Sequence, residues 1–169
     1  MALWTQGGFV DDRYARAETL EAAPQDGAVI VPLALWRAHG PALKRKCAAV
    51  GVELPAAKDA PATLAELADR PLVALGFAKF GDGRAFSYAR LLRTRLQYRG
   101  EIRAVGDVLF DEIGYMVRCG FDAFAIDDAP TLRLLRAGRS PIAPLVYQPG
   151  LARGEAHVGA RPWTAKVAL

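Results

Sequence analysis

The sequence predicts an α/β fold built on a mostly parallel sheet of about five strands joined by helices. First, short apolar runs alternate with longer stretches of helical spacing between residues 72 and 126. Second, the run at 72–77 (LVALGF) carries no charge, which is typical of a parallel strand covered on both faces. Third, helical spacing gathers a stripe of large side chains at Tyr88, Leu91, Leu92 and Leu96. Such a sheet could be open and doubly wound or could form a half-barrel, and both remain open here.

The part of the chain before the central strand predicts a hairpin, a loop and a strand–helix succession. Residues 3–10 are expected to form a short hairpin, because Gly7 and Gly8 can adopt the positive φ of a tight turn. Residues 11–27 are polar and alanine-rich, which is typical of a loop. The elements expected next are a strand at 28–31, helical segments at 33–39 and 42–49, a strand at 50–54 and a helix at 63–69.

The elements after the central strand repeat the strand–helix pattern. The helix that carries the Tyr88 stripe closes near Gly100. Asp107 stands where a helix N-cap is expected, since its side-chain oxygen can accept a bond from an unpaired helix amide. The remaining elements are a strand at 102–105, a helix burying Leu109, Ile113, Met116 and Val117, a strand at 121–126 and a helix around Leu132 and Leu135.

Length and composition predict one domain in the cytoplasm. Residues 1–148 are expected to form a single domain, and the weakly periodic residues 149–169 an extended C-terminal tail. No apolar stretch approaches the roughly 20 residues of a membrane span. The N-terminus lacks a signal-peptide pattern, and two cysteines do not make a secreted disulfide scaffold. We therefore expect a cytoplasmic protein with no membrane contact.

The charge of the chain is modestly basic. The formal net charge is +4 and the pI is about 9.3, with arginine concentrated after residue 84. An excess of this size is compatible with a small anionic ligand or an acidic protein partner. No nucleic-acid-binding motif accompanies it, so we expect no nucleic-acid partner.

The topology predicts a candidate site before any motif is considered. Ligands of parallel sheets and barrels bind beyond the carboxyl ends of the strands. The loop at 79–84 (KFGDGR) joins the central strand to a helix N-terminus, where its two basic residues add to a helix dipole that favours anions. The predicted anion site comprises Lys79, Asp82, Gly83, Arg84, Ser87, Asp107 and Asp127. The alternative is a tight turn in which Asp82 pairs with Arg84 or Lys79 and nothing binds.

Other kinds of site find less support. Gly81 and Gly83 match the first two glycines of a dinucleotide fingerprint, but Phe86 occupies the third position, which is too bulky for that helix–strand contact. The two histidines lie far apart and no Cys-x-x-Cys occurs, so no metal site is expected. Cys47 and Cys119 fit buried thiols better than a redox pair. The residues leave the cofactor and any catalytic group undefined.

Three segments carry a resemblance to a known family: 77–93 (FAKFGDGRAFSYARLLR), 98–109 (YRGEIRAVGDVL) and 118–124 (RCGFDAF). The late Tyr147-Gln148 adds to it. The chain resembles a family of uncharacterised bacterial proteins that are labelled by automatic inference as oxidoreductases of sulfite reduction. Genes of this family tend to lie beside the gene for assimilatory sulfite reductase, so the resemblance implies a role near that enzyme. It brings no established catalytic residues.

Three functions remain in competition. The first is an accessory protein of assimilatory sulfite reduction that docks on sulfite reductase or its electron donor through Arg90, Arg93, Arg95 and Arg99. The second is a small-molecule enzyme or binding protein that uses the anion site. The third is an NAD(P)- or flavin-dependent reductase, for which the absorbance spectrum of the purified protein is the discriminating measurement. A homo-oligomer is also compatible with the sequence, because a second subunit could complete a partial barrel.

Overall fold

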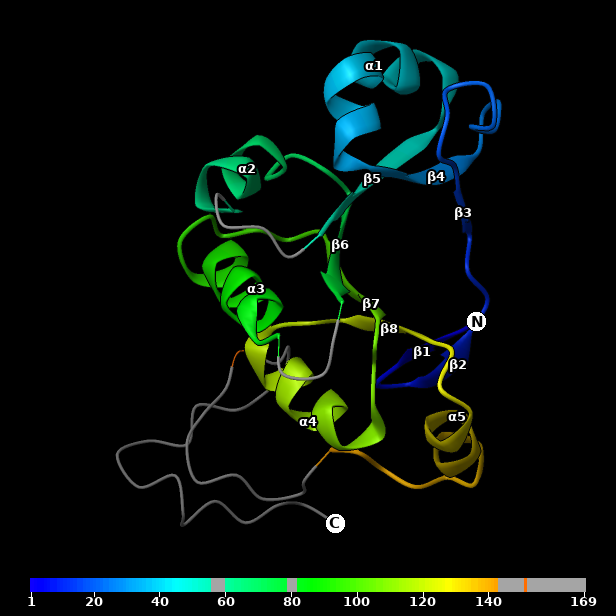
Figure 1. Ribbon diagram of the computed structural model, residues 1–169, viewed down its shortest axis with the longest axis vertical. Coiled ribbons are helices and arrows are strands. Elements are labelled where there is room, and N and C mark those ends of the chain that lie inside the picture. Colours follow the sequence, from blue (N-terminus) through cyan, green and yellow to red (C-terminus); the bar gives the residue numbers. More distant parts are fainter. Residues whose placement is uncertain (56–59, 79–81, 143–150, 152–169) are drawn as a thin grey trace.

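The computed structural model describes residues 1–55, 60–78, 82–142 and 151, and within them the chain forms eight strands and five helices (Figure 1). The strands are β1 (Ala2–Thr5), β2 (Gly8–Val10), β3 (Tyr14–Arg16), β4 (Ala28–Pro32), β5 (Ala49–Leu54), β6 (Leu72–Phe77), β7 (Glu101–Gly106) and β8 (Ala123–Ile126). The helices are α1 (Leu33–Lys46), α2 (Ala60–Glu66), α3 (Arg84–Thr94), α4 (Phe110–Cys119) and α5 (Ala129–Arg136). The predicted α/β class is confirmed.

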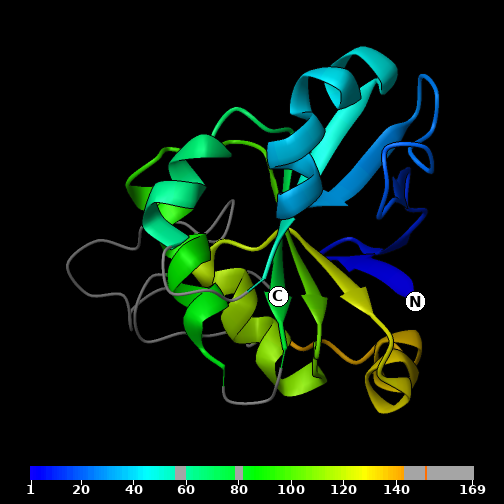
Figure 2. The ribbon, with the colours of Figure 1, turned by 45° about the horizontal axis from the view of Figure 1, so that its top comes forward.

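All eight strands join one mixed sheet in the order β2-β1-β8-β7-β6-β5-β4-β3. The strands β3 to β8 follow one another in chain order and are parallel, whereas β1 is antiparallel to both β8 and β2. The strand order never reverses among the parallel strands, so the sheet lacks the switch point of a doubly wound fold. Instead it curls into a half-barrel (Figures 1 and 2).

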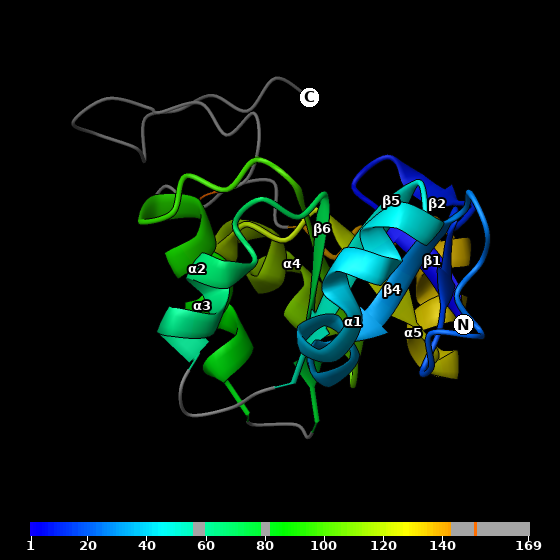
Figure 3. The same cartoon turned by 90° about the horizontal axis from the view of Figure 1, so that it is seen from above.

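The helices cover the convex face of the half-barrel. Right-handed crossovers between successive parallel strands place their helices on the same face of a sheet. Accordingly, α2, α3 and α4 lie side by side along one side of the strands, and α1 packs on β4 and β5 (Figure 3). The main core lies between these helices and the sheet, where side chains such as Val73, Leu75 and Phe77 of β6 are buried.

The concave face carries a second, smaller core. Alternation along β6 sends Leu72 and Ala74 to this face. Packing on this face is close at Gly51 of β5, where an added Cβ would approach the Leu72 side chain to 2.9 Å. The buried members of this cluster are Tyr14, Ile30, Leu72, Ala74, Val105 and Ala125.

Two parts of the N-terminal region differ from expectation. The predicted hairpin forms, but β1 also pairs along its whole length with β8, which extends the sheet. Within the segment expected to be a loop, β3 pairs in parallel with β4. The interruption expected near Gly40 is present, since α1 is kinked at His39, whose φ of −131° and ψ of 15° are not helical.

The N-cap expected at Asp107 is wrong. Helix α4 starts after Leu109, which provides no side-chain cap. The hydroxyl oxygen of Thr131 in α5 instead accepts a hydrogen bond from the Phe110 amide at 2.9 Å. The N-cap of α5 is Asp128, whose carboxylate accepts the Thr131 amide at 2.7 Å. Thr131 therefore links the first turns of both helices.

The predicted C-terminal tail, residues 149–169, lies outside the described residues apart from Leu151. The Leu151 amide donates to the Arg118 carbonyl at the end of α4, at 2.7 Å. Among the described helices, none combines the length and the apolar character that crossing a membrane would require.

Candidate functional site

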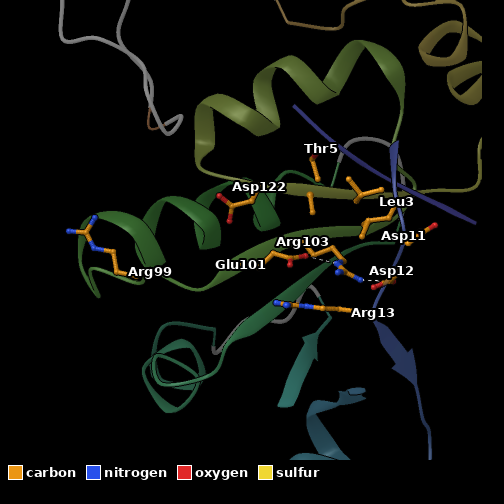
Figure 4. A pocket seen from close by; sticks show the side chains of 11 residues that line it. Leu3, Thr5, Asp11, Asp12, Arg13, Arg99, Glu101, Arg103 and Asp122 are labelled. Atoms are coloured by element: carbon orange, nitrogen blue, oxygen red, sulfur yellow. Dashed lines mark hydrogen bonds and ion pairs between the residues drawn. The ribbon is translucent and has the colours of Figure 1, made fainter. Parts of the chain in front are cut away.

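The half-barrel has a hollow at each end of its parallel strands. The hollow at the N-terminal ends has a volume of about 340 Å³ and lies beneath the β1–β2 hairpin (Figure 4). The hollow at the C-terminal ends, which we call the C-terminal mouth, has a volume of about 380 Å³. Both fall within the range of small-molecule sites, so the chemistry of their walls decides between them.

The N-terminal hollow is organised by Arg103 of β7. This side chain is only 2% exposed and donates to the carboxylates of Asp12 and Glu101, at 2.7 Å each. Figure 4 shows these three side chains pointing toward one another, whereas Arg99 extends away from them. Asp12 lies between β2 and β3, so its ion pair ties this connection to the middle of the sheet. The polar groups of the hollow are thus engaged with one another.

A second arginine, Arg93, forms a hydrogen-bond network near the same N-terminal end of the strands. Arg93 of α3 donates to the carbonyls of Tyr98 at 2.8 Å and of Gly100 and Gly120 at 3.0 Å, and it forms an ion pair with Asp122. Its side chain is only 11% exposed. The N-terminal end of a barrel usually serves stability rather than chemistry. Because these networks use the arginines internally, we assign this end to stability.

The C-terminal mouth is lined by residues from strands on both sides of the half-barrel. They are Met1, Arg16, Glu53, Pro55, Gly76, Phe77, Ala78, Val105, Gly106 and Asp127. Arg16 at the end of β3 and Glu53 of β5 form an ion pair across β4. Asp127 follows β8 and lies 2.8 Å from the Met1 amino group. This is the end at which barrels and parallel sheets bind their ligands.

Glycine is required at one position of the mouth. Gly106, the last residue of β7, has a φ of +91°, which residues with a side chain rarely adopt. A Cβ there would lie closer to the Phe77 carbonyl oxygen than real Cβ atoms come. The main chain of β7 stays close to that of β6 at the next residue, where the Asp107 amide donates to the same Phe77 carbonyl at 2.9 Å. The mouth is therefore walled here by main chain rather than by a side chain.

The residues predicted for the anion site are only partly brought together. Asp127 lines the mouth beside Gly106, whereas Asp107 and Ser87 are exposed and do not line it. Lys79 lies outside the described residues. Gly83 precedes α3 with a φ of −75°, and a Cβ there would meet nothing closer than 3.9 Å, so this position does not need glycine.

Asp82 and Arg84 pair with each other, as in the alternative considered above. The Arg84 guanidinium donates to both Asp82 carboxylate oxygens, at 2.8 and 2.7 Å. Hydrogen bonding from Arg84 lowers the pKa of Asp82 below its usual range. An anion bound at this loop would have to displace a bidentate carboxylate. Asp82 and Arg84 therefore form a neutral pair at the start of α3.

Sequence reasoning missed two of the charged residues at the mouth, Arg16 and Glu53. Glu53 had a visible signal, since it is the one charged side chain in the otherwise apolar strand VGVEL. Arg16 belongs to β3, which was not expected as a strand, so nothing placed it near the site. The proposed docking face also needs a correction, because Arg93 is engaged in the network described above, whereas Arg90, Arg95 and Arg99 are exposed.

Neither a metal site nor a reactive thiol emerges from the described residues. No group of three or more His, Cys, Asp or Glu side chains among them is placed to hold a metal ion. Cys47 and Cys119 are buried and do not form a disulfide. Burial raises the pKa of both thiols, which keeps them protonated at neutral pH.

Comparison with known proteins identifies a family to which the chain is similar. The model of a family described as "Bacterial protein of unknown function (DUF934)" matches residues 51–157. The chain belongs to this DUF934 family. The matched range begins in β5 and runs past α5, so it includes Glu53, Gly106 and Asp127 of the mouth. Searches of curated proteins and of solved structures found no match.

The cap of α5 leads to a pH-dependence prediction. Hydrogen bonds from Thr131 lower the pKa of Asp128, so the folded state favours the ionised carboxylate. This stabilisation is present above the unfolded-state pKa and is lost as the pH falls through the folded-state pKa. We expect Asp128→Ala to lower the melting temperature at pH 7 and to converge with the wild type in acid. Calorimetry between pH 7 and pH 3 checks this, and an unchanged difference across that range would contradict it.

Proposed function

We propose that this DUF934 protein binds a small polar molecule at the C-terminal mouth of its half-barrel and serves assimilatory sulfite reduction as an accessory protein. The observation that carries the binding proposal is the mouth itself, a hollow of about 380 Å³ at the carboxyl ends of parallel strands. The pathway is supported by the family resemblance in segments 77–93, 98–109 and 118–124.

The architecture supports a ligand site at this end rather than the other. At the N-terminal end, a buried arginine is ion-paired with two carboxylates that belong to the framework. At the mouth, the ion-paired side chains of Arg16 and Glu53 remain 36% and 30% exposed, and Asp127 is 71% exposed. Charged groups that water can reach are available to a ligand as well.

Filling the mouth tests the proposal in cells. Gly76 of β6 lines the mouth, and a Cβ there would find room, with its nearest neighbour at 3.6 Å. A larger side chain at this position would extend into the hollow. In a deletion strain grown on sulfate as the sole sulfur source, we expect the wild-type gene to restore growth and Gly76→Leu to fail although the protein folds.

The matched control for this experiment is Gly7→Leu, in the exposed turn of the hairpin, which should restore growth. Circular dichroism of both purified variants verifies that they fold. If the deletion strain grew on sulfate at the wild-type rate, the role in sulfite reduction would be rejected. If Gly76→Leu restored full growth, the mouth would be rejected as the working site.

A second candidate, docking on sulfite reductase or its electron donor, is favoured by the exposure of Arg90 and Arg95 on and beside α3. Exposed charges of one sign accelerate encounters with a partner of opposite sign. We expect the double variant Arg90→Glu/Arg95→Glu to weaken co-purification with the reductase by roughly tenfold. The wild-type interaction should also weaken as salt rises.

The control for docking reverses the same number of charges elsewhere. Arg133 and Arg136 are exposed on α5, so Arg133→Glu/Arg136→Glu changes the net charge equally without touching α3. Equal effects of the two double variants would show a response to net charge alone and would contradict a specific docking face.

A further inference from the structure

The charges at the C-terminal mouth are not those of a simple anion site. Arg16 and Glu53 form an ion pair, so together they contribute no net charge. Asp127 adds a carboxylate that is 71% exposed. The Met1 amino group, which also lines the mouth, is paired with this carboxylate. The described residues therefore give the mouth two ion pairs, with a carboxylate at Asp127 on one side and a guanidinium at Arg16 on the other.

The geometry at Asp127 is suited to an ammonium group. The Met1 amino group lies 2.8 Å from Asp127 Oδ1, which is the length of a strong charge-assisted hydrogen bond. A ligand ammonium that displaces the Met1 amino group can thus take the same place beside this carboxylate without moving the main chain of β8. A sulfate or phosphate in the same place would face repulsion from Asp127.

The geometry at Arg16 is suited to a carboxylate. A guanidinium has five N–H donors, more than the single carboxylate of Glu53 can accept, and the Arg16 side chain is 36% exposed. Arg16 ends β3 and Asp127 follows β8, strands that lie on opposite sides of β4 to β7 in the sheet. Both line the same hollow, so a ligand inside it lies between a cationic wall and an anionic wall.

We infer that the ligand of the C-terminal mouth is a zwitterion of amino-acid size, whose ammonium replaces the Met1 amino group at Asp127 and whose carboxylate pairs with Arg16. The apolar walls at Pro55 and Val105 would contact its side chain. This inference rests on the proposed function, because it assumes that the mouth binds a small molecule. It departs from the predicted anion site by requiring a positive charge on the ligand.

Calorimetric titration of the full chain with the standard L-amino acids tests the inference. For each amino acid that binds, the N-acetyl derivative removes the ammonium and the amide derivative removes the carboxylate, and inorganic sulfate serves as the probe without a cation. We expect each derivative to bind roughly 10- to 100-fold more weakly than the parent, the loss that follows removal of one charged hydrogen bond.

Charge-removing variants locate the site. Asp127→Asn and Arg16→Gln should each weaken binding of the parent amino acid by a similar factor, whereas Asp111→Asn, an exposed change on α4, should not. Asp127→Asn should also have little effect on the N-acetyl derivative, which has no ammonium to lose.

The outcomes separate the inference from the function on which it rests. If sulfate or N-acetyl derivatives bind as well as amino acids and Arg16→Gln weakens them, the zwitterion is overturned while the mouth remains a ligand site. If an amino acid binds but both mouth variants leave its affinity unchanged, the inference is overturned. If no member of the panel binds, the inference and the proposed ligand site are both overturned.

Discussion

Replacing Arg103 by methionine is expected to destabilise the protein by about 3–5 kcal/mol, the cost of removing one partner from a buried ion pair. The guanidinium is 2% exposed and is shared by Asp12 and Glu101. Methionine fills much of the same volume but leaves two partly buried carboxylates without their cation. The measurement is the free energy of unfolding in urea, at constant pH and salt.

The control and a double-mutant cycle identify the cause. Arg95→Met is an exposed change and should alter the free energy of unfolding by no more than about 0.5 kcal/mol. Asp12→Ala in the Arg103→Met background should cost less than Asp12→Ala alone, because its partner has already been removed. A loss below about 1 kcal/mol for Arg103→Met would show that the network does not hold the N-terminal segment in place.

The second large effect is expected for Gly106→Ala, which adds only one methyl group. At a φ of +91° the new residue pays a backbone strain of about 1–3 kcal/mol. Its Cβ also collides with the Phe77 carbonyl oxygen, a rigid main-chain atom, and overpacking of this kind costs a further 1–3 kcal/mol or so. We expect a total loss of roughly 2–6 kcal/mol, measured by thermal or urea unfolding.

Gly76→Ala is the matched control, since Gly76 pairs with Val105 beside Gly106 in the same two strands. A Cβ at Gly76 makes only ordinary contacts, at 3.6 Å and beyond, so the stability should change little. Comparable losses in both variants would mean that any side chain on this part of the rim is harmful, and the specific role of the positive φ would be refuted.

The parts of the fold that the sequence predicts are those with a local pattern. The uncharged run at 72–77 coincides with β6, because burial on both faces excludes charge along the whole strand. The buried stripe Ile113, Met116 and Val117 likewise lies on α4. By contrast, β3 is a three-residue strand with two exposed members, and only its pairing with β4 makes it a strand.

In the candidate site, too, the sequence predicts the residues that follow from local patterns and misses those that depend on how distant strands are arranged. The rule that ligands bind beyond the strand ends places Asp127 and Gly106 at the mouth. Arg16 reaches the mouth only because the sheet curls, and no local pattern predicts curling. A charged residue within an otherwise apolar strand could have indicated an ion pair on the concave face. Glu53 and Arg103 are two such residues, and both form ion pairs there. The loop at 79–84 (KFGDGR) was compatible with an anion site and with an internal ion pair, and the structure contains the Asp82–Arg84 pair.

The pairing of β1 with β8 has a consequence for synthesis of the protein. The hairpin leaves the ribosome well before β8, the last strand in the described part of the chain, with which it pairs from Ala2–Ile126 to Thr5–Ala123. At about 5–20 residues per second, the nascent hairpin waits on the order of 6–25 seconds for its partner. During that interval Leu3 and Trp4, both buried in the finished molecule, have no place in the sheet. The pairing of β1 with β8 can therefore form only after synthesis has passed Ile126.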